Sequence, residues 1–224
     1  MSVQRILDKE TIETGGFNGI TQKRLVVHPY YGPGVGVRKG TWTGIGNLVY
    51  LSDSFFAPGI ETGLHPHRHI DVLTFVVEGK LAHQGSLEHG VDVNAGEFQV
   101  QKAGLEGFMH NEKNTGTSTT RMLQMWLLPQ EEKPEASFRI YKAEKSKKIR
   151  VYGNEDNNST QLELISLEKD QEATIENHSL IYIVTGKVET DDQVISGGHL
   201  LETESIKIRA IEESILLTFF EEIK

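Results

Sequence analysis

Two pairs of side chains in the first half of the chain have the types and the spacing of metal ligands. His65 and His67 are separated by one residue, and so are His110 and Glu112. On an extended backbone, residues two apart point to the same side, so each pair can present two donor atoms to one ion. Three imidazole nitrogens and one carboxylate oxygen suit a divalent iron, nickel, copper, cobalt, manganese or zinc ion and leave positions for water or substrate.

These pairs need extended strands to hold them, and the chain is rich in runs of β-branched and aromatic residues bounded by glycine, asparagine, aspartate or proline. No long segment has a 3.6-residue period. Repeated short strands between turns favour a sandwich or a barrel. The expected strands are Asn47–Phe56, Val72–Val77, Phe98–Gln101, Met122–Leu128, Leu162–Leu167, Leu180–Val184 and Ile215–Phe220.

A short internal repeat predicts two similar lobes. Val77–Leu81 (VEGKL) matches Val184–Val188 (VTGKV), and in each case a strand runs into a glycine turn and a new strand. The polar, proline-bounded run Pro129–Pro134 is the expected connector, with 136–148 continuing it along the surface.

We therefore predict an all-β chain of two stacked antiparallel β-barrel lobes. The expected domains are an N-terminal, metal-binding lobe at 1–133 and a C-terminal lobe without metal ligands at 134–224.

Composition narrows the classes of function. The net charge is −9 and the longest basic run is Lys145–Arg150, which argues against direct binding to nucleic acid. No apolar stretch approaches the ~20 residues needed to cross a membrane. The absence of cysteine excludes disulfides and thiolate metal sites and fits a reducing compartment. The charged N-terminus lacks the apolar core of a secretory signal, so we expect a cytoplasmic protein.

The residues around the candidate ligands resemble a known family. Gly59, His65, His67 and Gly79 follow the spacing of the first cupin motif, and Gly107, His110 and Asn114 follow the end of the second. More closely, four segments resemble the pirins, a family within the cupin superfamily, and look most like the bacterial pirin-like branch that includes quercetin 2,3-dioxygenases. These segments are Leu64–Gly79, Ala82–Ser86, Ala95–Val100 and Ala103–Glu112.

The resemblance implies a bicupin fold, in which terminal segments cross over to complete the opposite lobe, and one metal ion in the N-terminal barrel. The family's ligands, three histidines and a glutamate, fall on His65, His67, His110 and Glu112. It also implies iron as the first expectation for the metal, ahead of nickel, copper, cobalt, manganese or zinc.

Some positions depart from the family pattern or leave alternatives open. His69 and Asp71 replace other residue types after the first motif, and Leu105 replaces a common proline. If the strand continues, His69 faces the same way as His67. It is then an alternate metal ligand or, as the sequence pattern favours, a histidine behind the ligands or at the rim of the barrel. Among other histidines, His83 and His89 are expected at the surface of a hairpin.

The C-terminal lobe lacks an equivalent ligand set. The repeat aligns His65 and His67 with Glu172 and Thr174, and the matching glycine turns align His110 and Glu112 with Glu212 and Ser214. The lone histidines of this half, His178 and His199, are expected to be structural or exposed.

Two functions follow from the resemblance. The first is a metal-dependent dioxygenase that cleaves a flavonol or another small aromatic substrate with dioxygen and releases carbon monoxide, with Glu112 as the catalytic group that takes the substrate's hydroxyl proton. The second is a regulatory protein whose metal state controls binding to a protein partner, without catalysis. Phe108 and Met109 either line the mouth of the site or pack ordinarily.

Overall fold

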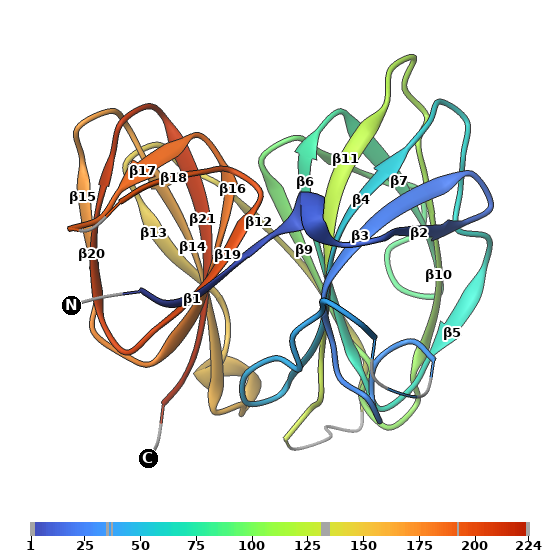
Figure 1. Ribbon diagram of the computed structural model, residues 1–224. Helices are drawn as coiled ribbons and strands as arrows, with labels where there is room; N and C mark the ends of the chain where they lie inside the picture. Colours follow the sequence, from blue (N-terminus) through green and yellow to red (C-terminus); the bar gives the residue numbers. More distant parts are fainter. Residues whose placement is uncertain (1–2, 35, 37, 131–134, 192, 223–224) are drawn as a thin grey trace. The chain divides into compact units, whose positions relative to one another are not determined.

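The computed structural model describes residues 3–34, 36, 38–130, 135–191 and 193–222, which form two compact units. The N-lobe comprises the described residues of 12–43 and 47–142, and the C-lobe those of 1–11, 44–46 and 143–224. Nearly all regular structure is antiparallel strand, so the all-β bicupin class is confirmed (Figure 1).

The N-lobe has a seven-stranded sheet, in the order β12-β9-β6-β11-β4-β3-β2, and a four-stranded sheet, in the order β5-β10-β7-β8. The strands are β2 Thr14–Phe17, β3 Ile20–Val27, β4 Leu48–Phe56, β5 His65–His67, β6 Asp71–Glu78, β7 Lys80–Gly85, β8 Val91–Asn94, β9 Glu97–Lys102, β10 Phe108–Lys113, β11 Thr120–Leu127 and β12 Ser137–Lys142.

The C-lobe repeats this plan, with sheets in the orders β1-β19-β16-β21-β14-β13 and β15-β20-β17-β18. Its elements are β1 Val3–Asp8, η1 Lys9–Thr11, β13 Lys148–Tyr152, η2 Asn154–Asp156, β14 Thr160–Leu167, β15 Glu172–Ile175, β16 Ser179–Thr185, β17 Lys187–Glu189, β18 Val194–Ser196, β19 His199–Thr203, β20 Ile206–Ala210 and β21 Ser214–Glu221. Every strand expected from the sequence is present, within a few residues at each end.

The repeated turn has the same place in both lobes. Gly79 joins β6 to β7 and Gly186 joins β16 to β17, with φ of 79° and 84°. Glycine adopts this left-handed backbone without strain, which explains why both copies keep it.

Two strands cross between the halves of the sequence. β1, from the start of the chain, pairs with β19 in the C-lobe, and β12, from beyond the expected connector, pairs with β9 in the N-lobe (Figure 1). Part of the expected surface connector at 136–148 is thus β12, an edge strand with half-buried and exposed residues that satisfies its backbone hydrogen bonds in the sheet. The expected boundary at 133/134 lies outside the described residues and stays a prediction.

The interior of the N-lobe is polar in the middle and apolar at both ends. On β6, Thr74 lies between Val72 and Val76 on one face, and on β11 Gln124 lies between Met122 and Trp126. Val76 and Met122 belong to one apolar cluster, and Val72 belongs to another, against which Trp126 packs. Buried polar side chains need hydrogen-bond partners. This central band is therefore the part of the interior where polar side chains must interact with one another or with a bound group.

The interior of the C-lobe is apolar at the corresponding positions. Ala173 and Ile175 of β15 pair with Ile208 and Ile206 of β20, in the places that His65, His67, His110 and Phe108 take in the N-lobe. These residues belong to one apolar cluster or pack against it.

The expected correspondences in the C-lobe are therefore wrong. Glu172 and Thr174 are exposed rather than facing the interior, and Glu212 and Ser214 lie beyond the end of β20. The repeat placed Glu172 and Thr174 one residue out of phase with Ala173 and Ile175, and a one-residue shift in a strand moves a side chain to the opposite face.

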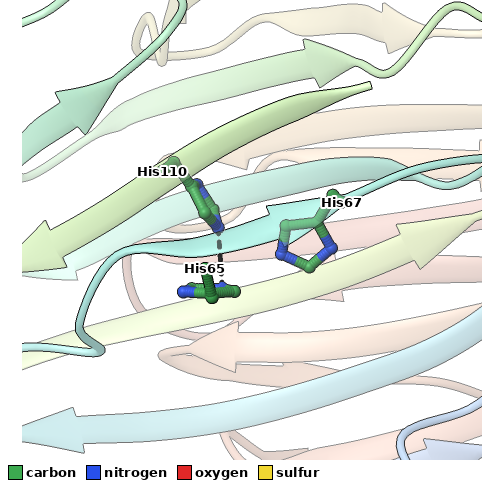
Figure 2. A group of neighbouring side chains, drawn as sticks. All are labelled: His65, His67 and His110. Carbon is green, nitrogen blue, oxygen red and sulfur yellow. Dashed lines mark hydrogen bonds between the residues drawn. The ribbon is translucent and has the colours of Figure 1, made fainter. Parts of the chain in front are cut away.

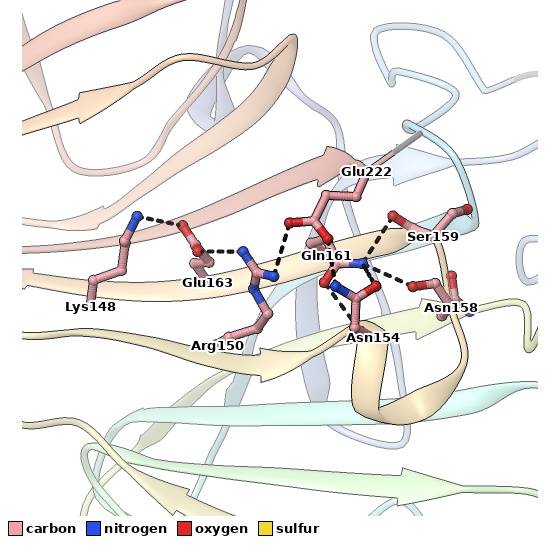
Figure 3. A network of polar contacts seen from close by, with 8 residues as sticks. All are labelled: Lys148, Arg150, Asn154, Asn158, Ser159, Gln161, Glu163 and Glu222. Atoms are coloured by element: carbon pink, nitrogen blue, oxygen red, sulfur yellow. Dashed lines mark hydrogen bonds and ion pairs between the residues drawn. The ribbon is translucent and has the colours of Figure 1, made fainter. Parts of the chain in front are cut away.

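Polar contacts at the edge of the C-lobe tie β13, β14 and β21 together. Arg150 donates to Glu163 and Glu222, each at 3.0 Å, and Gln161 bonds to the backbone oxygens of Asn158 and Ser159 (Figure 3). These charged groups have partners within the network, so they stabilise the strand edges.

Among the described residues, no helix is long and apolar enough to cross a membrane.

Candidate metal centre

Strand pairing brings three histidines together inside the N-lobe. β5 and β10 are antiparallel neighbours, and His65 lies directly opposite His110 while His67 lies opposite Phe108. One ring nitrogen from each of His65, His67 and His110 lies within 4.8 Å of the others (Figure 2). This is the only such group of potential ligands among the described residues.

Two glycines allow the strands that carry the histidines to approach closely. A Cβ on Gly107, where φ is 75°, would lie 2.5 Å from the carbonyl oxygen of His67. A Cβ on Gly85, opposite His110 on β7, would lie 2.1 Å from the carbonyl oxygen of Met109. Any side chain at either position would push β10 away from its neighbours.

Hydrogen bonds fix which nitrogen of two histidines carries the proton. His65 Nδ1 donates to the carbonyl oxygen of Gly63 at 2.7 Å, and His110 Nδ1 donates to Gln101 Oε1 at 2.8 Å. Both partners are acceptors, so in the neutral rings each Nε2 carries a lone pair. Those two Nε2 atoms face each other at 3.1 Å, the contact drawn as a dashed line in Figure 2.

A hydrogen bond across this 3.1 Å contact would require one ring to be charged or to give up its Nδ1 bond. Burial, with smaller contributions from His67, His65 and His83, lowers the pKa of His110 well below its ordinary value. A cation bound between the two lone pairs satisfies both without either cost.

His67 completes the donor set. Its Nε2 is buried and has no hydrogen-bond partner, which is costly for a polar atom inside a protein. Burial, with a smaller contribution from His65, lowers its pKa to about 4, so the ring is neutral at physiological pH. Three imidazoles that converge, one of them otherwise unsatisfied, fit a divalent transition metal.

Glu112 lies two residues beyond His110 on β10 and is buried, but it is not a member of the three-histidine group. Thr74 Oγ1 donates to its Oε1 at 2.7 Å and Gln124 Nε2 donates to its Oε2 at 3.1 Å. Burial raises the pKa of the Glu112 carboxyl to about 7, although the hydrogen bond from Thr74 opposes the rise. Glu112 as a metal ligand stays a prediction.

His83 is the clearest error of the sequence analysis. The expected surface histidine is fully buried, its Nε2 lies 2.9 Å from the carbonyl oxygen of Leu87, and its ring lies 5.8 Å from that of His110. It faces inward because it lies opposite Glu112 on β7, so the two share a face of the sheet. His89, by contrast, is exposed as expected.

The other residues named from the sequence take different places. His69 is exposed with φ of 58°, so strand parity does not extend from His67 and the rim position is favoured. Asp71 is buried and its Oδ1 accepts a hydrogen bond from the backbone of Ala103 at 2.9 Å. Asp71 thereby ties the start of β6 to the segment after β9.

The two lone histidines of the C-lobe have local partners. His178 Nε2 lies 3.0 Å from Glu202 Oε1, and His199 Nδ1 donates to the carbonyl oxygen of Ser196 at 2.9 Å. These contacts agree with the structural or exposed roles expected for both.

A hollow of about 300 Å³ opens at His67, the one member of the three-histidine group that lines it. His67, Phe108 and Met109 contribute to its lining, together with Gly107 and Ser86. Met109 is exposed and Phe108 is buried. Both residues line this hollow, and Phe108 also packs in the apolar cluster with Val72 and Ala103, so both roles stay open.

Sequence reasoning missed the polar residues that hold the site. Gln101 accepts from both His110 and Gln99, and Thr74 and Gln124 hold Glu112. A signal was present, because Gln99 and Gln101 occupy alternate positions on either side of Val100 and so had to share one face.

Comparison with known proteins agrees with this arrangement. The family model described as Pirin matches residues 41–127, which include the three histidines and Glu112. Residues 41–127 therefore carry a pirin domain. Among its relatives, quercetin 2,3-dioxygenase of Escherichia coli O157:H7 is 28% identical over 206 residues, covering 85% of this chain and 86% of the relative. A pirin-like protein of Caulobacter vibrioides is 36% identical over 84 residues, 38% of this chain and 36% of that protein.

Solved pirin structures share the fold over nearly the whole chain. The bacterial pirin YhhW of Escherichia coli in complex with nickel(II) has a TM-score of 0.82 at 22% identity, covering 98% of this chain and 99% of that one. A quercetin 2,3-dioxygenase from Acinetobacter baumannii has a TM-score of 0.71 at 17% identity, covering 98% and 86%. In this chain, the group formed by His65, His67 and His110 could hold a metal ion.

Proposed function

We propose that this protein is a metal-dependent dioxygenase that cleaves flavonol-type substrates with dioxygen. The observation that carries the proposal is the convergence of three imidazoles, of which His67 has an unsatisfied buried Nε2 and lines a hollow. Relatives named quercetin 2,3-dioxygenase support the reaction class. A cytoplasmic location stays part of the proposal.

We propose His65, His67, His110 and Glu112 as the metal ligands, with iron as the first expectation and nickel, copper, cobalt, manganese or zinc as alternatives. A bound divalent ion would act as a Lewis acid toward a substrate hydroxyl and increase its acidity. The chain's own contribution begins with the imidazoles, whose Nδ1 protons are held by Gly63 and Gln101 so that the Nε2 lone pairs stay available.

Glu112 is the proposed acceptor of the substrate's hydroxyl proton. Its pKa of about 7 is near the ambient pH, where a general base is most effective. Thr74 and Gln124 each donate to one carboxylate oxygen, so they orient the group. A carboxylate oxygen can accept more than one hydrogen bond, so each keeps capacity for a further proton donor.

The hollow is the proposed entrance for the substrate. Phe108 and Met109 offer apolar surface for a planar aromatic ring. His67, a proposed metal ligand, lines the same hollow and so connects it to the metal site. The rest of the central band, Thr74 and Gln124, lies on the opposite sheet and closes the site around Glu112.

The test is turnover of quercetin under air by metal-loaded protein, followed by loss of its visible absorbance and release of carbon monoxide. Metal-stripped protein should be inactive. Glu112→Gln, compared at equal metal content, should lose about 100- to 10,000-fold in rate, as for a positioned base. Glu176→Gln removes an exposed carboxylate of the C-lobe and should leave the rate unchanged.

Equal rates in the metal-matched wild type and Glu112→Gln would exclude Glu112 as the base. No cleavage with any of the six metals would contradict the dioxygenase and favour the regulatory alternative, in which metal state controls a protein partner.

A further inference from the structure

A second pocket of the N-lobe lies where the edge of the large sheet changes partner. β2 pairs with β3 only as far as Lys23. Further along β3, the backbone of Trp42 forms the hydrogen bonds instead, at Leu25 and Val26. Arg24 lies between these two stretches, next to an irregularity in the β3–β4 pairing. A cavity of about 320 Å³ opens at this position.

Three cationic side chains line this pocket, namely Arg24, Arg38 and Lys39. They gather in a chain whose net charge is −9, so their proximity is not a consequence of an excess of basic residues. Glu13 is the one carboxylate in the lining, and it is exposed. The pocket therefore has an excess of positive charge, which costs free energy unless an anion offsets it.

None of these three cations has an ion-pair partner among the described residues. Four other arginines do form such pairs, with Arg5 bound to Glu202, Arg121 to Asp53, Arg150 to Glu163 and Arg209 to Asp170. Even Glu13, which lines the same cavity, does not pair with the cations around it. The charges of the three cations are thus not offset by a carboxylate within the described residues.

The two guanidinium groups are already held in place. Arg24 donates through Nε and Nη2 to Gln22 Oε1, at 3.3 and 3.0 Å, and its Nη1 lies 3.3 Å from the position that a Cβ on Gly15 would occupy. Arg38 donates through Nη2 to the carbonyl oxygen of Pro33 at 3.1 Å. Holding these groups before binding lowers the entropic cost of binding a ligand.

We infer that this pocket is an anion-binding site for a compact oxyanion, a phosphate or a carboxylate group, held by Arg24, Arg38 and Lys39. Guanidinium groups match the geometry of both oxyanions, and a flexible ammonium adds a point charge. The pocket is lined by none of the three histidines, so it is a site separate from the metal centre.

The test is calorimetric titration of zinc-loaded protein at low ionic strength with inorganic phosphate and, separately, with acetate. We expect saturable binding of at least one of them below about 10 mM. The amide resonances of Gly15 and Thr41, which line the pocket, should shift during the titration. The arm that saturates at lower concentration identifies the preferred oxyanion.

The variant Arg38→Gln, Lys39→Gln should weaken this binding at least about tenfold, because it removes charge-assisted contacts. Both residues are exposed, so the fold should tolerate the change. The matched control Lys142→Gln, Lys169→Gln removes two exposed charges elsewhere and should bind as wild type does.

Three results would overturn the inference. These are no saturable binding of either anion, equal binding by the pocket variant and the wild type, or resonance shifts confined to residues around the histidines. The last result would place the anion at the zinc ion instead.

Discussion

Replacing Gln101 with leucine should weaken metal binding although Gln101 is not itself a proposed ligand. Gln101 Oε1 accepts two hydrogen bonds of 2.8 Å, from His110 Nδ1 and from Gln99 Nε2, and the residue is fully buried. Leucine would leave the His110 proton without an acceptor, which costs about 1–3 kcal/mol. Part of that cost disappears if the proton moves to Nε2, but Nε2 then loses the lone pair that faces the metal.

We therefore expect about 10- to 100-fold weaker binding of zinc or nickel by Gln101→Leu, measured by competition with a chromophoric chelator. Gln101→Glu keeps an acceptor for His110 and should retain the affinity. Gln22→Leu is the matched control, because Gln22 is a buried glutamine of the same lobe that bonds to Ser54 and Arg24 and to none of the three histidines.

A second readout separates this effect from a general loss of stability. In the metal-free protein, nitrogen NMR should show the His110 proton on Nδ1 in the wild type and in Gln22→Leu, and a changed tautomer in Gln101→Leu. Metal binding by Gln101→Leu that is as tight as that of the wild type would refute the reasoning.

Two further predictions follow from particular contacts. Gly107→Ala should lower both the melting temperature and the metal affinity, because its Cβ would lie 2.5 Å from the His67 carbonyl oxygen; Gly90→Ala, at φ of 81° with open space around it, should lower only the melting temperature. Glu202 is partly desolvated, which raises its pKa, but hydrogen bonds from Arg5 and other groups outweigh this and lower the pKa overall. Its contribution to stability is therefore present above the unfolded-state pKa and lost as the pH falls through the folded-state pKa, so thermal melts of Glu202→Gln should depend less on pH in that acidic range. Unchanged metal affinity in Gly107→Ala, or identical pH profiles for Glu202→Gln and the wild type, would contradict the respective arguments.

Local patterns in the sequence predicted the strands and the three histidines well. The pair His65 and His67 needed only the two-residue period of a strand, and the resemblance to pirins placed His110 next to them. The structure adds that His110 lies directly opposite His65, a pairing that depends on the register between β5 and β10. Register is set by long-range packing and by the glycine contacts, which the residues alone do not specify.

Side-chain environment was less predictable than strand position. His83 was expected at the surface because it lies in a hairpin, but its position opposite Glu112 turns it inward. In the C-lobe, a five-residue repeat was too short to fix the phase of the flanking strands, so the residues aligned with His65 and His67 were one position away from those that face the interior.

The crossing of β1 and β12 could be expected only from the resemblance to other bicupins. Each strand completes an edge of a sheet whose other strands come from the opposite half of the chain. Nothing in the composition of either segment distinguishes a crossing strand from a surface connector, because both are short and partly exposed.

The central claim is that His65, His67 and His110 bind one transition metal ion, and metal content tests it most directly. Elemental analysis of protein purified without chelators should give about one equivalent of a transition metal for the wild type, since the three convergent Nε2 atoms form one site. His65→Ala should lose most of this metal, and His178→Ala, at an exposed histidine of the C-lobe, should retain it. A wild type without transition metal, or full occupancy in His65→Ala, would contradict the account.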